Sequence, residues 1–219
     1  GKTWALLAEP LFHISNPDFG AIVFRRTFPQ ITLEGGLWDE SEGIYPYAGA
    51  QMTKGNLRWQ FPSGATVVMR SMENETDRYN YDGAQVPLIC FAQLESFTEK
   101  QFFSMLSRNR STCGVRPYVR ASCNPQPGWL ANFIQWWWDE QTGYAIPERS
   151  GKVRWFCRVG DGIRWASSAV ELKRKHPGVE PKSVTFIFSK LTDNAVLMKK
   201  DPGYLSNLMA LPLVDRERL

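Results

Sequence analysis

Residues 86–91 (VPLICF) form an uninterrupted apolar run between two polar segments. Such a run is typical of a strand that is covered on both faces, and strands of this kind belong to parallel sheets whose connections pass through helices. Thr98 can cap a helix that follows the run. Phe102, Phe103 and Leu106 would give that helix an apolar stripe. The run therefore predicts a buried strand of an α/β fold.

The rest of the chain alternates between strand-like and helix-like segments. Strands are expected at residues 21–26, 118–121, 153–159 and 184–188, and helices at residues 3–9, 33–38, 128–138, 168–175 and after Pro202. Residues 57–61 and 65–70 flank a Pro-Ser-Gly turn, which predicts a β-hairpin. This alternation predicts a mainly parallel sheet flanked by helices on both faces, with the hairpin as an insertion.

Composition and charge are compatible with an ordinary folded domain. The chain has 219 residues, of which 43% are hydrophobic and 22% charged, and a net charge of +4 that tolerates a polyanionic partner without requiring one. No apolar run approaches the roughly 20 residues that cross a bilayer, so no membrane partner is expected. The four cysteines form no CxxC pair, which argues against a zinc site or a disulfide framework and favours a reducing intracellular compartment.

The first three residues, Gly1-Lys2-Thr3, match the end of a phosphate-binding loop. In such a loop the lysine approaches the β- and γ-phosphates, and the hydroxyl binds Mg²⁺. The glycines that precede this tripeptide in the motif are absent, and a tripeptide this short also arises by chance. We therefore expect the sequence to be a fragment that begins inside the loop.

The apolar run ends at Ala92 and Gln93. In nucleotide hydrolases with a phosphate loop, a strand of this kind ends in Asp-Glu. The aspartate holds the Mg²⁺ shell and the glutamate polarises the attacking water. On these residues alone, a core strand that ends in a polar loop is the simpler interpretation.

Four segments together resemble the large terminase subunit of tailed phages. They are FRRTFPQI (24–31), LICFAQLESFTEKQF (88–102), RSTCGVRPYVRASCNPQPGWL (110–130) and DNAVLMKKDPGYLSNLMALP (193–212). The resemblance covers essentially the whole chain in the family's order. It implies a P-loop NTPase of the ASCE type, in which residues 1–219 are a single ATPase motor domain and the C-terminal nuclease lies outside the sequence.

The resemblance implies ATP and Mg²⁺ as cofactors. Gly1 and Lys2 would hold the β- and γ-phosphates, and Thr3 would bind Mg²⁺. Ala92 and Gln93 occupy the metal-organising and water-activating positions, where the family is expected to carry Asp-Glu. Alanine cannot hold a metal-bound water, and glutamine cannot accept a proton. The resemblance therefore predicts ATP binding with very slow or absent hydrolysis. An engineered trap is our preferred explanation, and a naturally degenerate motif is the alternative.

The resemblance also implies a coupling segment and an assembly. Ser122 and Asn124 would sense the γ-phosphate and pass its loss to a moving segment. Arg78 would reach a neighbouring subunit's ATP in a homo-oligomeric ring, with a solvated loop arginine as the alternative. Double-stranded DNA, a portal protein and a small terminase subunit would be the partners, in the host cell cytoplasm.

Other conspicuous residues have simpler explanations. The three adjacent tryptophans at 136–138 are better explained by core and interface packing than by base stacking. The basic clusters at 173–175 and 199–200 are more typical of helix ends than of a DNA-facing surface. Glu95 and Glu99 follow the altered motif, where either could partly replace the lost carboxylate, although a loop or helix-start role is simpler.

Two other functions remain open on the sequence. The first is a non-hydrolysing nucleotide-binding or DNA-clamp module whose missing carboxylates are native. The second is a helicase-like motor of the same broad fold, against which the Ser-Cys-Asn-Pro segment at 122–125 argues.

Overall fold

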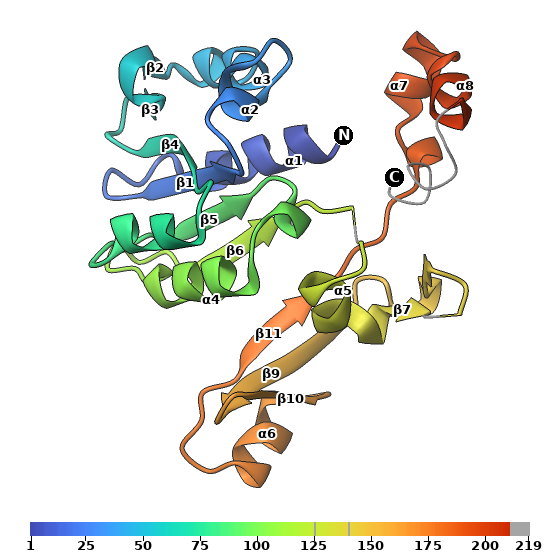
Figure 1. Ribbon diagram of the computed structural model, residues 1–219. Coiled ribbons are helices and arrows are strands. Elements are labelled where there is room, and N and C mark those ends of the chain that lie inside the picture. The colour runs from blue at the N-terminus through green and yellow to red at the C-terminus, as the bar shows by residue number, and fades with distance from the viewer. Residues whose placement is uncertain (125, 140, 211–219) are drawn as a thin grey trace. The chain divides into compact units, whose positions relative to one another are not determined.

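The computed structural model describes residues 1–124, 126–139 and 141–210 (Figure 1). The chain forms two compact units, Gly1–Leu130 and the described residues from Ala131 onward. Each unit buries a hydrophobic cluster of its own. The chain thus packs as two bodies where the sequence suggested one, and their action as a single motor domain stays a prediction. Pro125 and residues 211–212 of the segments quoted above lie outside the described residues.

The first unit is built on a six-stranded sheet with the strand order β2-β3-β4-β1-β5-β6. The strands are β1 (Gly20–Arg25), β2 (Gln51–Thr53), β3 (Arg58–Gln60), β4 (Thr66–Ser71), β5 (Leu88–Phe91) and β6 (Tyr118–Ala121). β4, β1, β5 and β6 pair with one another in parallel, whereas the pairs β2–β3 and β3–β4 are antiparallel. The predicted α/β fold, the parallel sheet and the hairpin of β3 and β4 are confirmed.

β5 is buried on both faces, as its apolar sequence predicts. All four of its residues are buried. Cys90 shares a cluster with Leu6 and Leu7 of helix α1 (Lys2–Ala8). On the opposite face, the ring of Phe91 lies 5.8 Å from that of Phe102 in helix α4 (Glu99–Arg108). α1 and α4 therefore cover opposite faces of the sheet (Figure 1).

Helix α4 begins with the cap that the sequence predicts. The hydroxyl of Thr98 accepts a hydrogen bond from the N–H of Gln101, and the N–H of Thr98 donates to the side-chain Oε1 of Gln101. Gln101 is fully buried, and its amide also donates to the carbonyls of Met72 and Asn74. Its Oε1 accepts from Arg26 at 2.6 Å. This side chain fastens α4 to the segments that follow β1 and β4.

The segment between β1 and β2 carries two short helices, α2 (Pro29–Thr32) and α3 (Leu37–Glu42). The helix predicted at residues 33–38 begins later, at Leu37. Gly35 takes a left-handed φ of 70°, and a Cβ on Gly36 would lie 2.7 Å from the carbonyl of Leu33, so the chain turns sharply before the helix. Trp38 of α3 stacks on Trp59 of β3 at 5.1 Å, which joins the hairpin to this helical segment.

The second unit holds an antiparallel sheet of three strands, β9 (Val153–Val159), β10 (Gly162–Ala166) and β11 (Lys182–Thr185), in the order β10-β9-β11. The expectation of parallel pairing is wrong here. β9 and β10 are joined by the two residues Gly160 and Asp161, and so tight a connection joins only antiparallel strands. The strand expected at 184–188 is β11, which begins and ends earlier.

The remaining elements of this unit are short. They are α5 (Trp129–Ile134, which begins in the first unit), η6 (Gln135–Trp137), β7 (Trp138–Asp139), β8 (Tyr144–Ala145), α6 (Ala169–Lys175), α7 (Ala195–Lys200) and α8 (Tyr204–Met209). The helix predicted at 128–138 therefore ends at Ile134. Trp137 is fully buried and packs beside Trp165, while Trp136 lies between the guanidinium groups of Arg149 and Arg154. Among the described residues, no helix combines the length and apolar character that crossing a bilayer demands.

Candidate functional site

The carboxyl ends of β5 and β6 lie side by side, because the two strands are parallel neighbours. The N–H of Ser122 donates to the carbonyl of Phe91 at 2.9 Å, and the N–H of Leu94 donates to the carbonyl of Ser122 at 2.9 Å. The N–H of Gln93 also donates to the hydroxyl of Ser122 at 3.3 Å. The turn after β5 and the turn after β6 are thus hydrogen-bonded into one unit.

Lys2 reaches the same place from the start of α1. Its ammonium donates to the carbonyl of Cys123 at 3.1 Å and to the side-chain oxygen of Asn124. The segment 122–124 therefore contacts both Lys2 and Gln93. Four of the predicted site residues, which are Lys2, Gln93, Ser122 and Asn124, are brought together at this edge of the sheet, and Gly1 and Thr3 flank Lys2 in the sequence.

The two altered motif residues differ in their surroundings. Ala92 is buried, and its N–H continues the sheet by donating to the carbonyl of Phe24. Gln93 is exposed and has a left-handed backbone, with φ 59° and ψ 67°. That conformation costs a residue other than glycine about 1–2 kcal/mol, and strained residues of this kind cluster at functional sites.

Glu95, two residues after Gln93, is the carboxylate of this region. Burial raises its pKa, against the opposing effects of hydrogen bonds from the main chain of Glu95 and Asn124 and of the charges of Lys2 and Arg25. Its Oε2 is buried and has no hydrogen-bond partner in the described part of the chain. Arg25, at the end of β1, donates weakly to the carbonyl of Ala92 at 3.4 Å. Burial lowers the pKa of Arg25, and Glu95 opposes that shift.

Arg78 is not part of this group in the described contacts. It lies on η4 (Glu75–Tyr81), which follows β4 rather than β5 or β6. Its guanidinium forms an ion pair with Glu75 at 3.3 Å and donates to the hydroxyl of Tyr79 at 2.7 Å. These contacts hold the side chain within its own turn.

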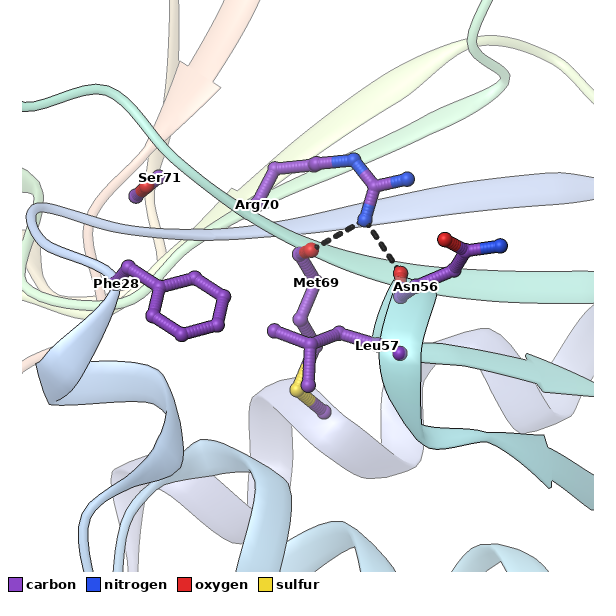
Figure 2. Close-up of a pocket in the computed structure, with 7 residues that line it drawn as sticks. Phe28, Asn56, Leu57, Met69, Arg70 and Ser71 are labelled. Atoms are coloured by element: carbon purple, nitrogen blue, oxygen red, sulfur yellow. Dashed lines mark hydrogen bonds between the residues drawn. The ribbon is translucent and has the colours of Figure 1, made fainter.

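A separate shallow pocket of about 230 Å³ lies at the end of β4. It is lined by Phe28, Gly55, Asn56, Leu57, Met69, Arg70 and Ser71. Figure 2 shows the ring of Phe28 opposite Leu57, with the guanidinium of Arg70 anchored on the carbonyls of Met69 and Asn56. The lining includes no predicted site residue, so this pocket is distinct from the group around Lys2.

Comparisons with known proteins identify the family of this chain. The sequence model of the T4-like large terminase subunit, N-terminal part, matches residues 1–219. The chain belongs to this terminase family. Large terminases of this kind carry an ATPase domain, and their general role is the packaging of phage DNA. No protein of curated function matches the chain.

Two solved structures are similar to this terminase domain. The ATPase domain of the large terminase of Thermus phage P74-26 matches 100% of this chain and 82% of its own, with 12% identity and a TM-score of 0.53. A variant of that domain, with one arginine replaced by alanine, matches 64% of this chain and 62% of its own at 12% identity and a TM-score of 0.43. Identity this low shows the fold alone, and the first match agrees with the α/β architecture described above.

The residues of the terminase site fit a magnesium nucleotide. Among the described residues, no group of three His, Cys, Asp or Glu side chains is arranged to hold a metal ion. Mg²⁺ in nucleotide sites needs few protein ligands, because phosphates and waters supply most of its oxygens. The hydroxyl of Thr3, which follows Lys2 in the sequence, is the predicted ligand.

Two further charged residues lie in this region: Glu95, which the sequence offers as a partial replacement for the lost carboxylate, and Arg25, which was not predicted. Arg25 is the last residue of β1 and Glu95 follows the end of β5, at the edge where these two parallel strands finish together. The signal that identifies them is their position relative to strand ends, which becomes clear only when the strand order is known. A glutamate two residues beyond the motif looks like an ordinary loop residue until the burial of its Oε2 is known.

Proposed function

We propose that this terminase domain binds ATP with Mg²⁺ and couples its turnover to the packaging of double-stranded DNA into a procapsid. The observation that carries the proposal is the convergence of Lys2 with the segment 122–124 at the carboxyl ends of β5 and β6. In open α/β sheets, ligands bind outside the carboxyl ends of the strands. A lysine at that edge in a terminase fold supplies the positive charge that a polyphosphate needs.

Each residue of the group has a role in this proposal. Lys2 neutralises the β- and γ-phosphates, Gly1 contributes its main chain, and Thr3 binds Mg²⁺. Asn124, with Ser122, senses the γ-phosphate. Lys2 exchanges the side chain of Asn124 for phosphate oxygens when ATP binds, and Asn124 is released. ATP and its products thereby stabilise different arrangements of the segment 122–124, which is the differential affinity that a motor requires.

Hydrolysis in this terminase is proposed to be slow. Ala92 has no side-chain oxygen for the metal shell, and Gln93 has no basic oxygen for the attacking water. Removal of such groups typically lowers a rate by factors of about 10²–10⁴. Replacing Ala92 with Asp together with Gln93 with Glu should raise the hydrolysis rate by a similar factor.

Assembly and partners follow from the same proposal. The subunits form a ring in the host cytoplasm together with a portal protein and a small terminase subunit, and Arg78 serves the ATP of a neighbouring subunit. For that role Arg78 has to exchange its contacts with Glu75 and Tyr79 for the neighbour's phosphates. The net positive charge of the second unit supports DNA contact through that unit. Residues 1–130 hold twelve Lys and Arg against twelve Asp and Glu, and residues 131–210 hold twelve against eight.

A non-hydrolysing nucleotide-binding or DNA-clamp module is the alternative, and the side chains of Ala92 and Gln93 favour it. In that case ATP would order the site without being consumed. A terminase that binds ATP and releases no phosphate above background, with DNA and the ring present, would support the clamp.

The proposed function is tested by titrating the intact terminase subunit with a fluorescent ATP analogue, with and without Mg²⁺. Lys2→Ala should weaken binding at least about tenfold, because one charge–phosphate contact contributes more than 1.4 kcal/mol. Lys100→Ala is the matched control, since Lys100 is exposed on α4 and pairs with Glu75. Equal affinity of the wild type and Lys2→Ala would overturn the proposal.

A further inference from the structure

Glu95 carries a buried oxygen that the fold leaves unused. Glu95 is the middle residue of η5 (Leu94–Ser96), the short turn directly after the altered motif residues Ala92 and Gln93. Its Oε2 is buried and accepts no hydrogen bond within the described part of the chain. Leaving a buried acceptor without a partner costs free energy, more so for a charged group. Native proteins tolerate such groups chiefly where catalysis or an unseen ligand accounts for them.

The surroundings of Glu95 belong to the nucleotide site proposed above. The charges of Lys2 and Arg25 act on its carboxylate, and the main chain of Asn124 donates to it. Yet neither cation forms an ion pair with Glu95 among the described residues. Lys2 donates to the segment 122–124, and Arg25 donates to the carbonyl of Ala92. The carboxylate of Glu95 is therefore influenced by the positive charges of Lys2 and Arg25 but forms no salt bridge with either of them among the described residues.

Other nearby carboxylates do not share these properties. Glu9 pairs with Arg120 at 3.0 Å. Glu99 is exposed in the first turn of α4, one turn farther along the chain. Glu95 alone, of these three, combines burial, an unused oxygen and proximity to Lys2.

We propose that Glu95 is the catalytic carboxylate of this terminase and replaces the glutamate that the motif lacks at Gln93. The inference rests on the proposed function. The water oxygen attacks the γ-phosphorus, and the bond from that phosphorus to the β–γ bridging oxygen breaks with its electron pair leaving on ADP. Glu95 accepts the proton that the water loses and later returns it to solvent. ATP and water thereby give ADP, inorganic phosphate and one proton.

This assignment agrees with slow rather than absent turnover. A carboxylate on η5 supplies the base, while Ala92 still leaves the metal shell one oxygen short. Burial also raises the pKa of Glu95, which brings a base closer to the pH at which it works. The left-handed backbone of Gln93 starts the turn that carries Glu95, so the strained residue and the base belong to one local structure.

The test measures phosphate release and binding of a fluorescent ATP analogue by the intact terminase with Mg²⁺ and DNA. Glu95→Gln should lower kcat at least about 100-fold, the range expected for a lost general base. It should leave analogue affinity unchanged or increase it up to about tenfold, because one negative charge beside the triphosphate is removed. Glu99→Gln is the matched control, with kcat and affinity within about twofold of wild type. A merely structural Glu95 would instead lower affinity and melting temperature together.

The possible outcomes distinguish a failure of the proposed function from a failure of the assignment of Glu95 as the base. If the wild type hydrolyses ATP and Glu95→Gln keeps kcat within threefold, Glu95 is not the base, while the proposed function stands. If the wild type binds ATP without any turnover, the inference fails and the clamp is supported. If the wild type binds no ATP, both fail.

A second variant, Glu95→Asp, is used if Glu95→Gln does not fold. It retains the negative charge and shortens the side chain by one methylene, which moves the carboxylate away from the reacting water. That variant should lose at least about tenfold in kcat, and full activity in it overturns the inference.

Discussion

The ammonium of Lys2 lies 3.1 Å from the main-chain carbonyl of Cys123 and also donates to the side chain of Asn124. More than a hundred residues separate these partners in the sequence. The contact joins the start of α1 to the turn after β6, and so links the candidate phosphate-binding residue to the candidate coupling segment. A ligand that draws Lys2 away from Asn124 changes the hydrogen bonding of that segment directly.

Asn124→Ala separates nucleotide binding from coupling. The variant keeps Lys2 but loses the side-chain oxygen of Asn124, from which Lys2 has to move when ATP binds. ATP affinity should therefore stay within about fivefold of wild type. ATP-driven DNA packaging should fall at least about tenfold, because the segment 122–124 no longer responds to the γ-phosphate. Nucleotide titration and an in vitro packaging assay measure the two effects. Asn207→Ala, at an exposed position of α8, is the control. Packaging at the wild-type rate would remove Asn124 from the coupling path.

Gln101→Met tests the buried amide that fastens α4. The substitution keeps the volume of the side chain but removes its contacts with Arg26, Met72 and Asn74. Each buried group left without a partner costs about 1–3 kcal/mol, so the free energy of unfolding should fall by about 2–4 kcal/mol. Urea unfolding measures the change. Gln60→Met, on an exposed position of β3, should change stability by less than about 0.5 kcal/mol. A small effect at both positions would show that water replaces the lost contacts.

Glu95→Gln should alter the pH dependence of stability in a defined direction. Burial holds the folded pKa of Glu95 above its unfolded value, which is about 4.3. The protonated form therefore contributes stability that is complete below the unfolded pKa and is lost as the pH rises through the folded pKa. Glutamine does not titrate, so the variant should gain stability relative to wild type as the pH rises above the unfolded pKa and through the raised folded pKa of Glu95. Unfolding curves at several pH values measure the difference. Parallel curves for the two proteins would contradict the raised pKa.

Much of the fold follows from local sequence, because the signals are local. The apolar run at 86–91 predicts β5, since a strand covered on both faces has no polar side to show. Thr98 and Gln101 give the start of α4, because a capping box needs only residues three apart. The parallel ends of β5 and β6 then bring Ser122 beside Gln93.

The parts that the sequence did not predict have different physical causes. The antiparallel sheet of the second unit follows from a two-residue connection after Val159, which the parallel interpretation overlooked. The helix expected at 33–38 moved because Gly35 and Gly36 impose a turn. The burial of Glu95 comes from three chain segments that meet only in the folded protein. Local patterns carry no information about such a meeting.

The basic residues of the second unit differ in how far they are neutralised. In α6, Lys173 pairs with Glu180 at 2.8 Å and Lys175 pairs with Glu171 at 2.7 Å. In α7, Lys199 and Lys200 are exposed, and no ion pair within the described part of the chain involves them. The basic cluster of α6 is thus partly satisfied by the protein, whereas that of α7 remains available to a polyanion.

Neutralising α7 should therefore weaken DNA binding more than neutralising α6. If both lysines contact phosphates, Lys199→Gln with Lys200→Gln should reduce the slope of log affinity against log salt by about 0.9 for each lost contact. The loss should be similar for different DNA sequences, because phosphate contacts carry no base information. Lys173→Gln with Lys175→Gln is the matched control, and its slope should change by less than half as much, since those lysines already have carboxylate partners. Binding titrations from low to physiological salt measure both slopes. Equal slopes for wild type and the α7 variant would exclude α7 from the DNA-contacting surface.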